Sequence, residues 1–176
     1  IQPIADRKGV EFSFRAIPDE LNVYFDKQKM LQVITNLLAN AIKFVGSDIG
    51  KASLIFSDHI DHIQIVVKDN GNGVPKVDRP FIFDKFYQSD EQAYKKNDGS
   101  GFGLAICKQI VELHGGRIFL DESYKKGAKF IVELPKTFKN ECSYSEQNSN
   151  SYEFVVWFII FFLCYARREK DRKTKY

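Results

Sequence analysis

The sequence predicts an α/β fold, a two-layer sandwich in which a mixed, mostly antiparallel sheet carries helices on one face. Three observations lead to this prediction. Residues 26–44 have the apolar spacing of a long amphipathic helix, two pairs of apolar segments have the spacing of β-hairpins, and a second apolar helix lies between those pairs. This order of elements is typical of a sheet that packs its helices on one side.

Length and composition are those of one globular domain with an appended C-terminal part. The chain has 176 residues, of which 44% are hydrophobic and 28% charged. Its net charge is +3, but residues 167–176 hold six Lys/Arg against two Asp/Glu, so the remainder is close to neutral. This balance disfavours nucleic-acid binding. Three scattered cysteines, Cys107, Cys142 and Cys164, lack metal-ligand spacing and predict reduced thiols rather than a zinc site.

The first elements are short. IQPIADRKG is typical of a helix that ends at Gly9, and because no secretory signal opens the chain we expect a piece of a longer protein. Residues 10–14 and 21–25 are strand candidates around a Pro18-Asp19 turn. Asp26 is the expected N-cap of the long helix. Its apolar side comprises Leu31, Ile34, Leu37, Leu38, Ala41 and Ile42.

The later elements alternate hairpins with loops. Residues 52–57 and 60–68 predict one hairpin, and residues 117–122 and 128–134 predict another. Between them, aromatic residues 80–87 indicate an anchored short element, and polar residues 88–99 indicate a flap. The helix that begins near Leu104 is expected to end at Gly115-Gly116.

One polar helical face contains Asn36, Asn40 and Lys43, at i, i+4 and i+7. Two amides and an ammonium on a largely buried helix are costly unless a ligand satisfies them, and a metal-bound phosphate would do so. Asn40 could offer an amide oxygen to Mg²⁺, and Lys43 could meet a phosphate as a point charge. For the helix alone, solvated surface side chains are the alternative.

Glycine-rich turns flank the expected sheet. Asp69 ends an apolar strand before Gly71 and Gly73, where its carboxylate could accept a hydrogen bond from an exocyclic amine, the group that distinguishes adenine from guanine. An Asx-turn is the alternative. The turn at residues 99–103 precedes a helix N-terminus, whose N–H groups and positive dipole end suit a triphosphate. Its spacing is neither a P-loop nor a dinucleotide fingerprint, and a turn without a ligand has the same pattern.

Four segments in order resemble the sequence boxes of the ATP-binding catalytic domain of sensor histidine kinases. This superfamily also contains type II topoisomerases, heat-shock chaperones and mismatch-repair ATPases. QVITNLLANAIKF resembles the N box, DNGNGVP the first glycine box, IFDKFYQ the F box and GSGFGLAICKQIVELHGG the second glycine box. The resemblance covers about residues 1–136 and implies a Bergerat-type fold with ATP and Mg²⁺ as cofactors.

The resemblance also implies residue roles. Asn40 matches the Mg²⁺ ligand, Asn36 its catalytic partner one turn earlier, and Lys43 a phosphate contact. Asp69 matches the residue that reads adenine, in a pocket shaped by Gly71 and Gly73. The other matched positions are the aromatic lid anchors Phe83 and Phe86, Tyr87 near the nucleotide, and the lid and phosphate residues Gly99, Ser100, Gly101, Phe102, Gly103 and Leu104.

Two departures from the family pattern affect the expected chemistry. Phe102 stands where Leu is usual, and Gln88 stands where many of these kinases have an Arg that reaches the terminal phosphate. Lys85 could partly replace that Arg in catalysis.

Asn36 separates the possible functions. Related chaperone and topoisomerase ATPases resemble one another in having Glu there, as a base for water, and an amide cannot act as that base. Transfer of the γ-phosphate to a histidine does not need it, because positioning and charge stabilisation dominate. His59, His62 and His114 lie outside any acceptor-like helix, so we expect the acceptor on separate dimerisation helices, with relay to a response regulator. A nucleotide-binding regulatory module without transfer and an ATP-hydrolysing clamp are the alternatives.

The C-terminal part is not covered by the resemblance. Residues 137–153 are polar and predict a linker, and residues 154–166 are uninterruptedly apolar. As a helix these 13 residues would span about 20 Å, against about 30 Å of hydrocarbon in a bilayer. We expect the catalytic domain on the cytoplasmic side. Membrane contact by residues 154–166, docking to a partner, and a non-native extension all stay open, and residues 154–176 receive no role.

Overall fold

A computed structural model describes residues 2–15, 25–46, 49–88 and 101–136 of the chain. The elements are α1 (Gln2–Arg7), β1 (Glu11–Arg15), α2 (Lys27–Phe44), β2 (Lys51–Asp58), β3 (His62–Asp69), α4 (Gly103–Leu113), β4 (Arg117–Leu120) and β5 (Lys129–Pro135). Within these residues the five strands form one sheet in the order β1-β2-β3-β5-β4. β1 runs parallel to β2, and the other neighbours are antiparallel.

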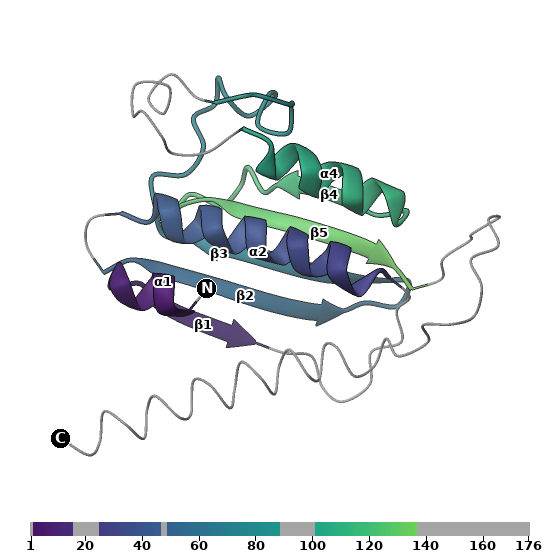
Figure 1. The fold of residues 1–176 in the computed structure, drawn as a ribbon, viewed down its shortest axis with the longest axis horizontal. Helices are drawn as coiled ribbons and strands as arrows, with labels where there is room; N and C mark the ends of the chain where they lie inside the picture. The colour runs from purple at the N-terminus through teal and green to yellow at the C-terminus, as the bar shows by residue number, and fades with distance from the viewer. Residues whose placement is uncertain (1, 16–24, 47–48, 89–100, 137–176) are drawn as a thin grey trace, which may run out of the picture.

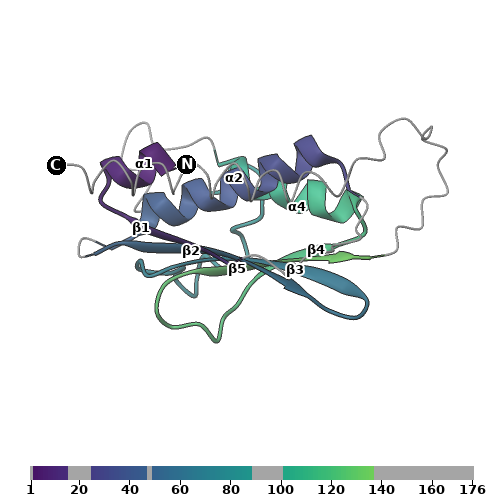
Figure 2. The ribbon, with the colours of Figure 1, turned by 90° about the horizontal axis from the view of Figure 1, so that it is seen from below.

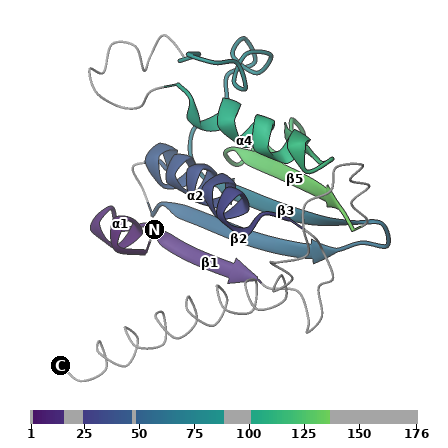
Figure 3. The same ribbon diagram turned by 45° about the vertical axis from the view of Figure 1, so that its right-hand side comes forward.

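The helices cover one face of this sheet (Figure 1). Figure 2 views the sheet edge-on and places α1, α2 and α4 on the same side. Figure 3 shows α2 and α4 side by side above the central strands. The predicted two-layer α/β fold with a mostly antiparallel mixed sheet is therefore confirmed. In the described part of the chain, no helix combines the length and apolar character needed to cross a membrane.

The sequence of α2 explains its position. Asp26 caps the helix as predicted, because its Oδ1 accepts a hydrogen bond from the Lys29 N–H at 3.0 Å. One side of the helix is buried against the sheet and α4, through Met30, Val33, Ile34, Leu37, Leu38, Ala41 and Ile42. The helix thus presents its remaining, partly exposed side to the candidate site.

Alternation along the strands supplies the rest of the core. Ile63, Ile65 and Val67 of β3 are buried with Val132 and Leu134 of β5. Cys107 of α4 is a free, buried thiol, and burial raises its pKa to about 11, so it is neutral at physiological pH. Cys142 and Cys164 lie outside the described residues.

Several predicted boundaries move by one or two residues. The first strand runs from Glu11 to Arg15, and β3 begins at His62 because Ile60 is 99% exposed in the turn. β4 ends at Leu120, two residues before the predicted end. Residues 80–87 form successive turns rather than a helix or strand. The strand predicted at residues 21–25 and the flap at 88–99 lie almost wholly outside the described residues.

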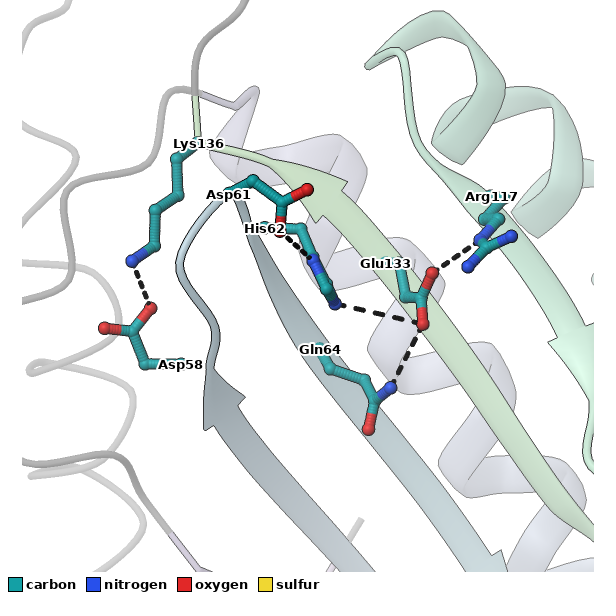
Figure 4. Close-up of polar contacts among 7 residues, drawn as sticks. All are labelled: Asp58, Asp61, His62, Gln64, Arg117, Glu133 and Lys136. Carbon is teal, nitrogen blue, oxygen red and sulfur yellow. Dashed lines mark hydrogen bonds and ion pairs between the residues drawn. The ribbon is translucent and has the colours of Figure 1, made fainter.

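Polar contacts link β3 to β5 and β5 to β4, and a separate ion pair lies at the end of β2 (Figure 4). Glu133 accepts hydrogen bonds from Arg117 at 2.5 Å and Gln64 at 3.1 Å. His62 Nδ1 lies 2.7 Å from the Asp61 carboxylate, and Lys136 pairs with Asp58 at 2.7 Å. His62 therefore has structural partners.

Candidate functional site

Asp69, the last residue of β3, is the most enclosed carboxylate among the described residues, with 4% of its surface exposed. Its Oδ1 accepts two backbone hydrogen bonds, from the Gly71 N–H at 2.8 Å and the Ala128 N–H at 3.1 Å. Burial raises the pKa of Asp69, although these two donors oppose the rise. Both hydrogen bonds go to Oδ1, and none within the described residues reaches the second oxygen. Since no fully buried side-chain oxygen in these residues lacks a partner, this second oxygen must be accessible to solvent or a ligand.

The glycine turn after Asp69 packs too closely for side chains. A Cβ on Gly71 would lie 1.8 Å from the carbonyl oxygen of Phe44, at the end of α2. Gly73 has φ +72°, and a Cβ there would lie 3.0 Å from the carbonyl oxygen of Gly127. The turn is therefore held between the end of α2 and the loop that joins β4 to β5.

The polar residues of α2 are partly exposed, and one of them contacts α4. Asn36, Asn40 and Lys43 are all half-buried, and the Asn36 amide donates to the carbonyl oxygen of Gly103 over 3.4 Å, a long hydrogen bond. The Lys43 ammonium lies 4.9 Å from the centre of the Phe44 ring. The structure thus brings Asn36 to the first residue of α4, with Asn40 and Lys43 further along α2 toward Gly71.

The N-terminus of α4 has no side-chain cap. Phe102 occupies the cap position without a side-chain hydrogen bond, and Gly101 before it has φ +71°. A Cβ on Gly103 would meet nothing within 4 Å, so the backbone there can be approached closely. Uncapped N–H groups at the positive end of a helix are suited to an anion.

An aromatic contact joins residues 86–87 to residues 101–102. Phe86 has φ +66°, unusual for a residue with a side chain, and its ring centre lies 4.5 Å from that of Phe102. A Cβ on Gly101 would lie 3.0 Å from the backbone of Phe86. Phe83 packs edge-on against Phe130 of the sheet. The aromatic stretch is therefore anchored to the sheet at one end and to the start of α4 at the other.

The remaining predicted residues have varied surroundings. The Tyr87 hydroxyl donates to Asp78 at 2.8 Å, and Leu104 packs half-buried against the core. Lys85 is exposed, and in the described residues no hydrogen bond or ion pair joins its side chain to α2 or α4. Gly99 and Ser100 lie outside the described residues.

Residues of the β4–β5 loop approach Asp69, and the sequence did not indicate them. Tyr124 donates from its hydroxyl to the backbone carbonyl of Asp69 at 3.2 Å. Glu122 accepts from Arg79 at 2.9 Å, which ties the loop to the segment after the glycine turn. A glycine at position 127 was the available signal, since it marked a tight turn, but it could not show what the turn packs against.

Comparison with known proteins agrees with this geometry. Residues 25–137 match the family of histidine kinase-, DNA gyrase B- and HSP90-like ATPases. The chain is 37% identical to the sensor histidine kinase WalK of Bacillus subtilis over 140 residues. The aligned region covers 78% of this chain and 23% of WalK. Over 139 residues the chain is 37% identical to hybrid signal transduction histidine kinase D of Dictyostelium discoideum, 76% of this chain and 9% of that protein.

Solved structures with this fold include two histidine kinases. The nucleotide-free catalytic domain of histidine kinase ThkA superposes with a TM-score of 0.67 at 31% identity, over 77% of this chain and 85% of that one. Full-length ShkA in complex with AMPPNP gives a TM-score of 0.64 at 30% identity, over 76% of this chain and 27% of that one.

The chain belongs to the family of histidine kinase-, DNA gyrase B- and HSP90-like ATPases. Within that family, its structural neighbours are catalytic domains of histidine kinases, so the predicted family and fold are confirmed. The chain spans about a quarter or less of the length of the two curated relatives described above.

Proposed function

We propose that this chain binds Mg-ATP and acts as the catalytic domain of a sensor histidine kinase. In this proposal it transfers the γ-phosphate to a histidine on separate dimerisation helices, from which a response regulator aspartate receives it. The proposal places the catalytic unit in residues 1–136, with residues 137–153 as a linker, and assigns no role to residues 154–176.

The carboxylate of Asp69 carries the proposal. Two backbone N–H groups hold one of its oxygens, and the other is left open beside a turn that has no side chains at Gly71 and Gly73. A fixed carboxylate with one oxygen left to accept, beside backbone without side chains, suits the 6-amino group of adenine. Guanine has a carbonyl oxygen at that position, which the carboxylate would repel, so the site should prefer ATP to GTP.

The start of α4 supports binding of the phosphates. Its N–H groups have no side-chain cap, and the positive end of the helix dipole favours negative charge. Lys43 lies seven residues after Asn36, near the end of α2. Its role as a further phosphate contact is proposed from the resemblance alone. These groups would orient the terminal phosphate, which is the main task in phosphoryl transfer.

A magnesium ion fits the donor set only together with a nucleotide. In the described ranges, no cluster of three or more His, Cys, Asp or Glu side chains could hold a metal ion. Mg²⁺ prefers oxygen ligands and usually combines one or two protein oxygens with phosphates and water. We propose that the half-buried amide of Asn40 is that protein ligand. The bound ion would neutralise phosphate charge, and Asn40 would orient it relative to α2.

Asn36 favours transfer over hydrolysis. Its amide donates to Gly103 and cannot remove a proton from water, so in this proposal it positions the start of α4. A neutral imidazole is already nucleophilic and needs no such base. Gln88, in place of an arginine, favours the second candidate function, a nucleotide-binding module that does not transfer phosphate.

A phosphotransfer assay with the full chain tests these alternatives. The chain is mixed with labelled ATP, Mg²⁺ and a dimeric helix pair that carries the acceptor histidine of a related kinase. Acid-labile, base-stable label on the helix pair supports the kinase. Calorimetric binding of ATP without label supports the regulatory module, and steady release of phosphate without an acceptor supports a hydrolysing clamp. No heat of binding for ATP in magnesium buffer overturns the proposal.

A further inference from the structure

The hydrogen bonding between Asp69 and Ala128 departs from that of a regular sheet. The register of β3 and β5 pairs Lys68 with Lys129, so the next pair is Asp69 with Ala128. The Asp69 N–H donates to the Ala128 carbonyl oxygen at 3.0 Å, which makes this a hydrogen-bonded antiparallel pair. In such a pair the second bond normally runs from the partner N–H to the first residue's carbonyl oxygen.

Here that second bond is diverted. The Ala128 N–H donates to the side-chain Oδ1 of Asp69 at 3.1 Å instead of to its backbone oxygen. The backbone oxygen of Asp69 accepts from the Tyr124 hydroxyl at 3.2 Å. The Tyr124 hydroxyl therefore donates to the Asp69 carbonyl oxygen, to which the Ala128 N–H would donate in a regular sheet.

The surroundings favour this exchange. Gly127 lies so close that a Cβ there would be 2.2 Å from the Asp69 carbonyl oxygen, so the loop backbone closes over that atom. A buried carbonyl oxygen without a donor is costly, and the half-buried Tyr124 supplies one. Burial and the nearby Asp69 charge raise the pKa of Tyr124, so its hydroxyl keeps the proton that it donates.

Other contacts hold the loop in place. Asp121 accepts from the Ser123 N–H at 2.9 Å and pairs with Lys129 at 2.8 Å, which closes the loop on itself. Glu122 pairs with Arg79, whose side chain also donates to the Val74 carbonyl oxygen at 3.1 Å. The loop is thereby fixed both to β5 and to the segment that follows the glycine turn.

We propose that Tyr124 is a positioning residue for purine recognition: its hydroxyl occupies the Asp69 carbonyl oxygen and so leaves the Ala128 N–H to hold the Asp69 carboxylate toward a 6-amino group. The nucleotide in this inference comes from the proposed function. The arrangement of hydrogen bonds among Asp69, Tyr124 and Ala128 does not depend on it. Without the hydroxyl, the Ala128 N–H can return to the backbone oxygen, and the carboxylate loses one of its two restraints.

The test uses the full chain with Tyr124→Phe, and with Lys126→Gln as a control at an exposed position of the same loop. Calorimetry compares ATP with purine riboside triphosphate, which lacks the 6-amino group. We expect Tyr124→Phe to lower the affinity for ATP about threefold to tenfold, the range for one lost hydrogen bond. The affinity for the analogue should change by less than about twofold. Lys126→Gln should change neither.

A second measurement needs no nucleotide. In the unsubstituted chain, the amide proton shift of Ala128 should follow the ionisation of the Asp69 carboxylate in a pH titration by NMR. In the Tyr124→Phe variant that response should disappear, because the amide no longer contacts the carboxylate.

The outcomes separate the two proposals. Equal weakening of ATP and the analogue would assign Tyr124 a general structural role and overturn the inference. An Ala128 amide that ignores Asp69 in the unsubstituted chain, or still follows it in Tyr124→Phe, overturns it as well. Absence of ATP binding by the unsubstituted chain overturns the proposed function, and the NMR titration then decides the role of Tyr124 alone.

Discussion

The imidazole of His114 accepts a hydrogen bond from the backbone N–H of Asp26, with 2.9 Å between Nε2 and the amide nitrogen. Its Nδ1 lies 2.7 Å from the Ile110 carbonyl oxygen, which assigns the ring proton to Nδ1. One neutral ring thus joins the C-terminus of α4 to the residue that caps α2. The relative position of these two helices sets the distance between Asn36 and Gly103 in the candidate site.

Replacing His114 should therefore destabilise the domain. We expect His114→Ala to lower the free energy of unfolding by about 1–2 kcal/mol, because the Asp26 N–H loses its acceptor and α4 loses a contact at its end. Leu113→Ala, at a neighbouring side chain that is 73% exposed, should cost much less. Urea denaturation followed by circular dichroism measures both. Equal losses in the two variants would show that the Asp26 contact contributes little.

Asp69→Asn should separate stability from binding. The Asn oxygen can still accept from Gly71 and Ala128, and the cost of burying a charge disappears, so the free energy of unfolding at pH 7 should stay equal or rise. The affinity for ATP should fall at least about tenfold, because an amide replaces the charged acceptor. Calorimetry and thermal unfolding on one preparation measure both. A variant that loses stability but keeps its affinity for ATP would contradict this prediction.

Acidification should weaken ATP binding before ordinary aspartates titrate. Burial raises the pKa of Asp69, so this carboxyl takes up its proton at a higher pH than an exposed aspartate. Because the pKa is raised in the folded state, ionisation of Asp69 lowers the free energy of unfolding as the pH rises through that pKa. As the pH is lowered from 7.5, ATP affinity should decline with uptake of a single proton, and the decline should begin at a higher pH than the titration of an exposed aspartate. The decline should be absent for the residual binding of Asp69→Asn.

Asn40→Ala should act through magnesium. If the amide is the protein ligand, the gain in ATP affinity on adding Mg²⁺ should shrink at least about tenfold, while affinity in EDTA changes little. The side chain is half-buried, so we expect only a small change in stability. Gln32→Ala, at an exposed position of the same helix, is the control. An equal loss of affinity with and without Mg²⁺ would argue against metal ligation by Asn40.

The two glycine turns should respond differently to alanine. Gly71→Ala would place a Cβ 1.8 Å from the Phe44 carbonyl oxygen, so α2 and the turn must separate, at a cost of about 3 kcal/mol or more. Gly103→Ala meets nothing within 4 Å, and it should leave stability unchanged or raise it by up to about 1 kcal/mol. Chemical denaturation measures both. Tolerance of alanine at Gly71 would show that this close approach is not required.

Asp121 should make stability depend on pH at the acid end. Lys129 and Ser123 lower its pKa from 3.8 to about 2. The ionised carboxylate therefore stabilises the fold above its ordinary pKa, and this contribution is lost as pH falls through about 2. Because the pair is partly exposed, we expect Asp121→Asn to cost only about 1 kcal/mol at pH 7, with the difference shrinking below pH 4. Urea denaturation of the two chains between pH 7 and pH 2 measures this difference, and a cost that stays constant below pH 4 would contradict the prediction.

Much of this structure could be read from local patterns. Asp26 as a cap, the apolar side of α2, the two hairpins and the helix that ends before Gly115-Gly116 each depend on neighbours within a few residues, which the sequence displays directly. Asp69 was also singled out, and the hydrogen bond from the Gly71 N–H to its Oδ1 is the Asx-turn that the sequence offered as the structural alternative.

The partners of those residues depended on how the elements pack. β5 pairs with β3 on one edge and β4 on the other, and this order brings Ala128 and Tyr124 to Asp69. Helix packing likewise brings His114 to Asp26, 88 residues away. Sequence periodicity specifies which face of an element is buried, but it carries no information about which distant element covers that face. Strand order, register and helix packing make that choice, because they decide which distant N–H and O–H groups come within hydrogen-bonding distance.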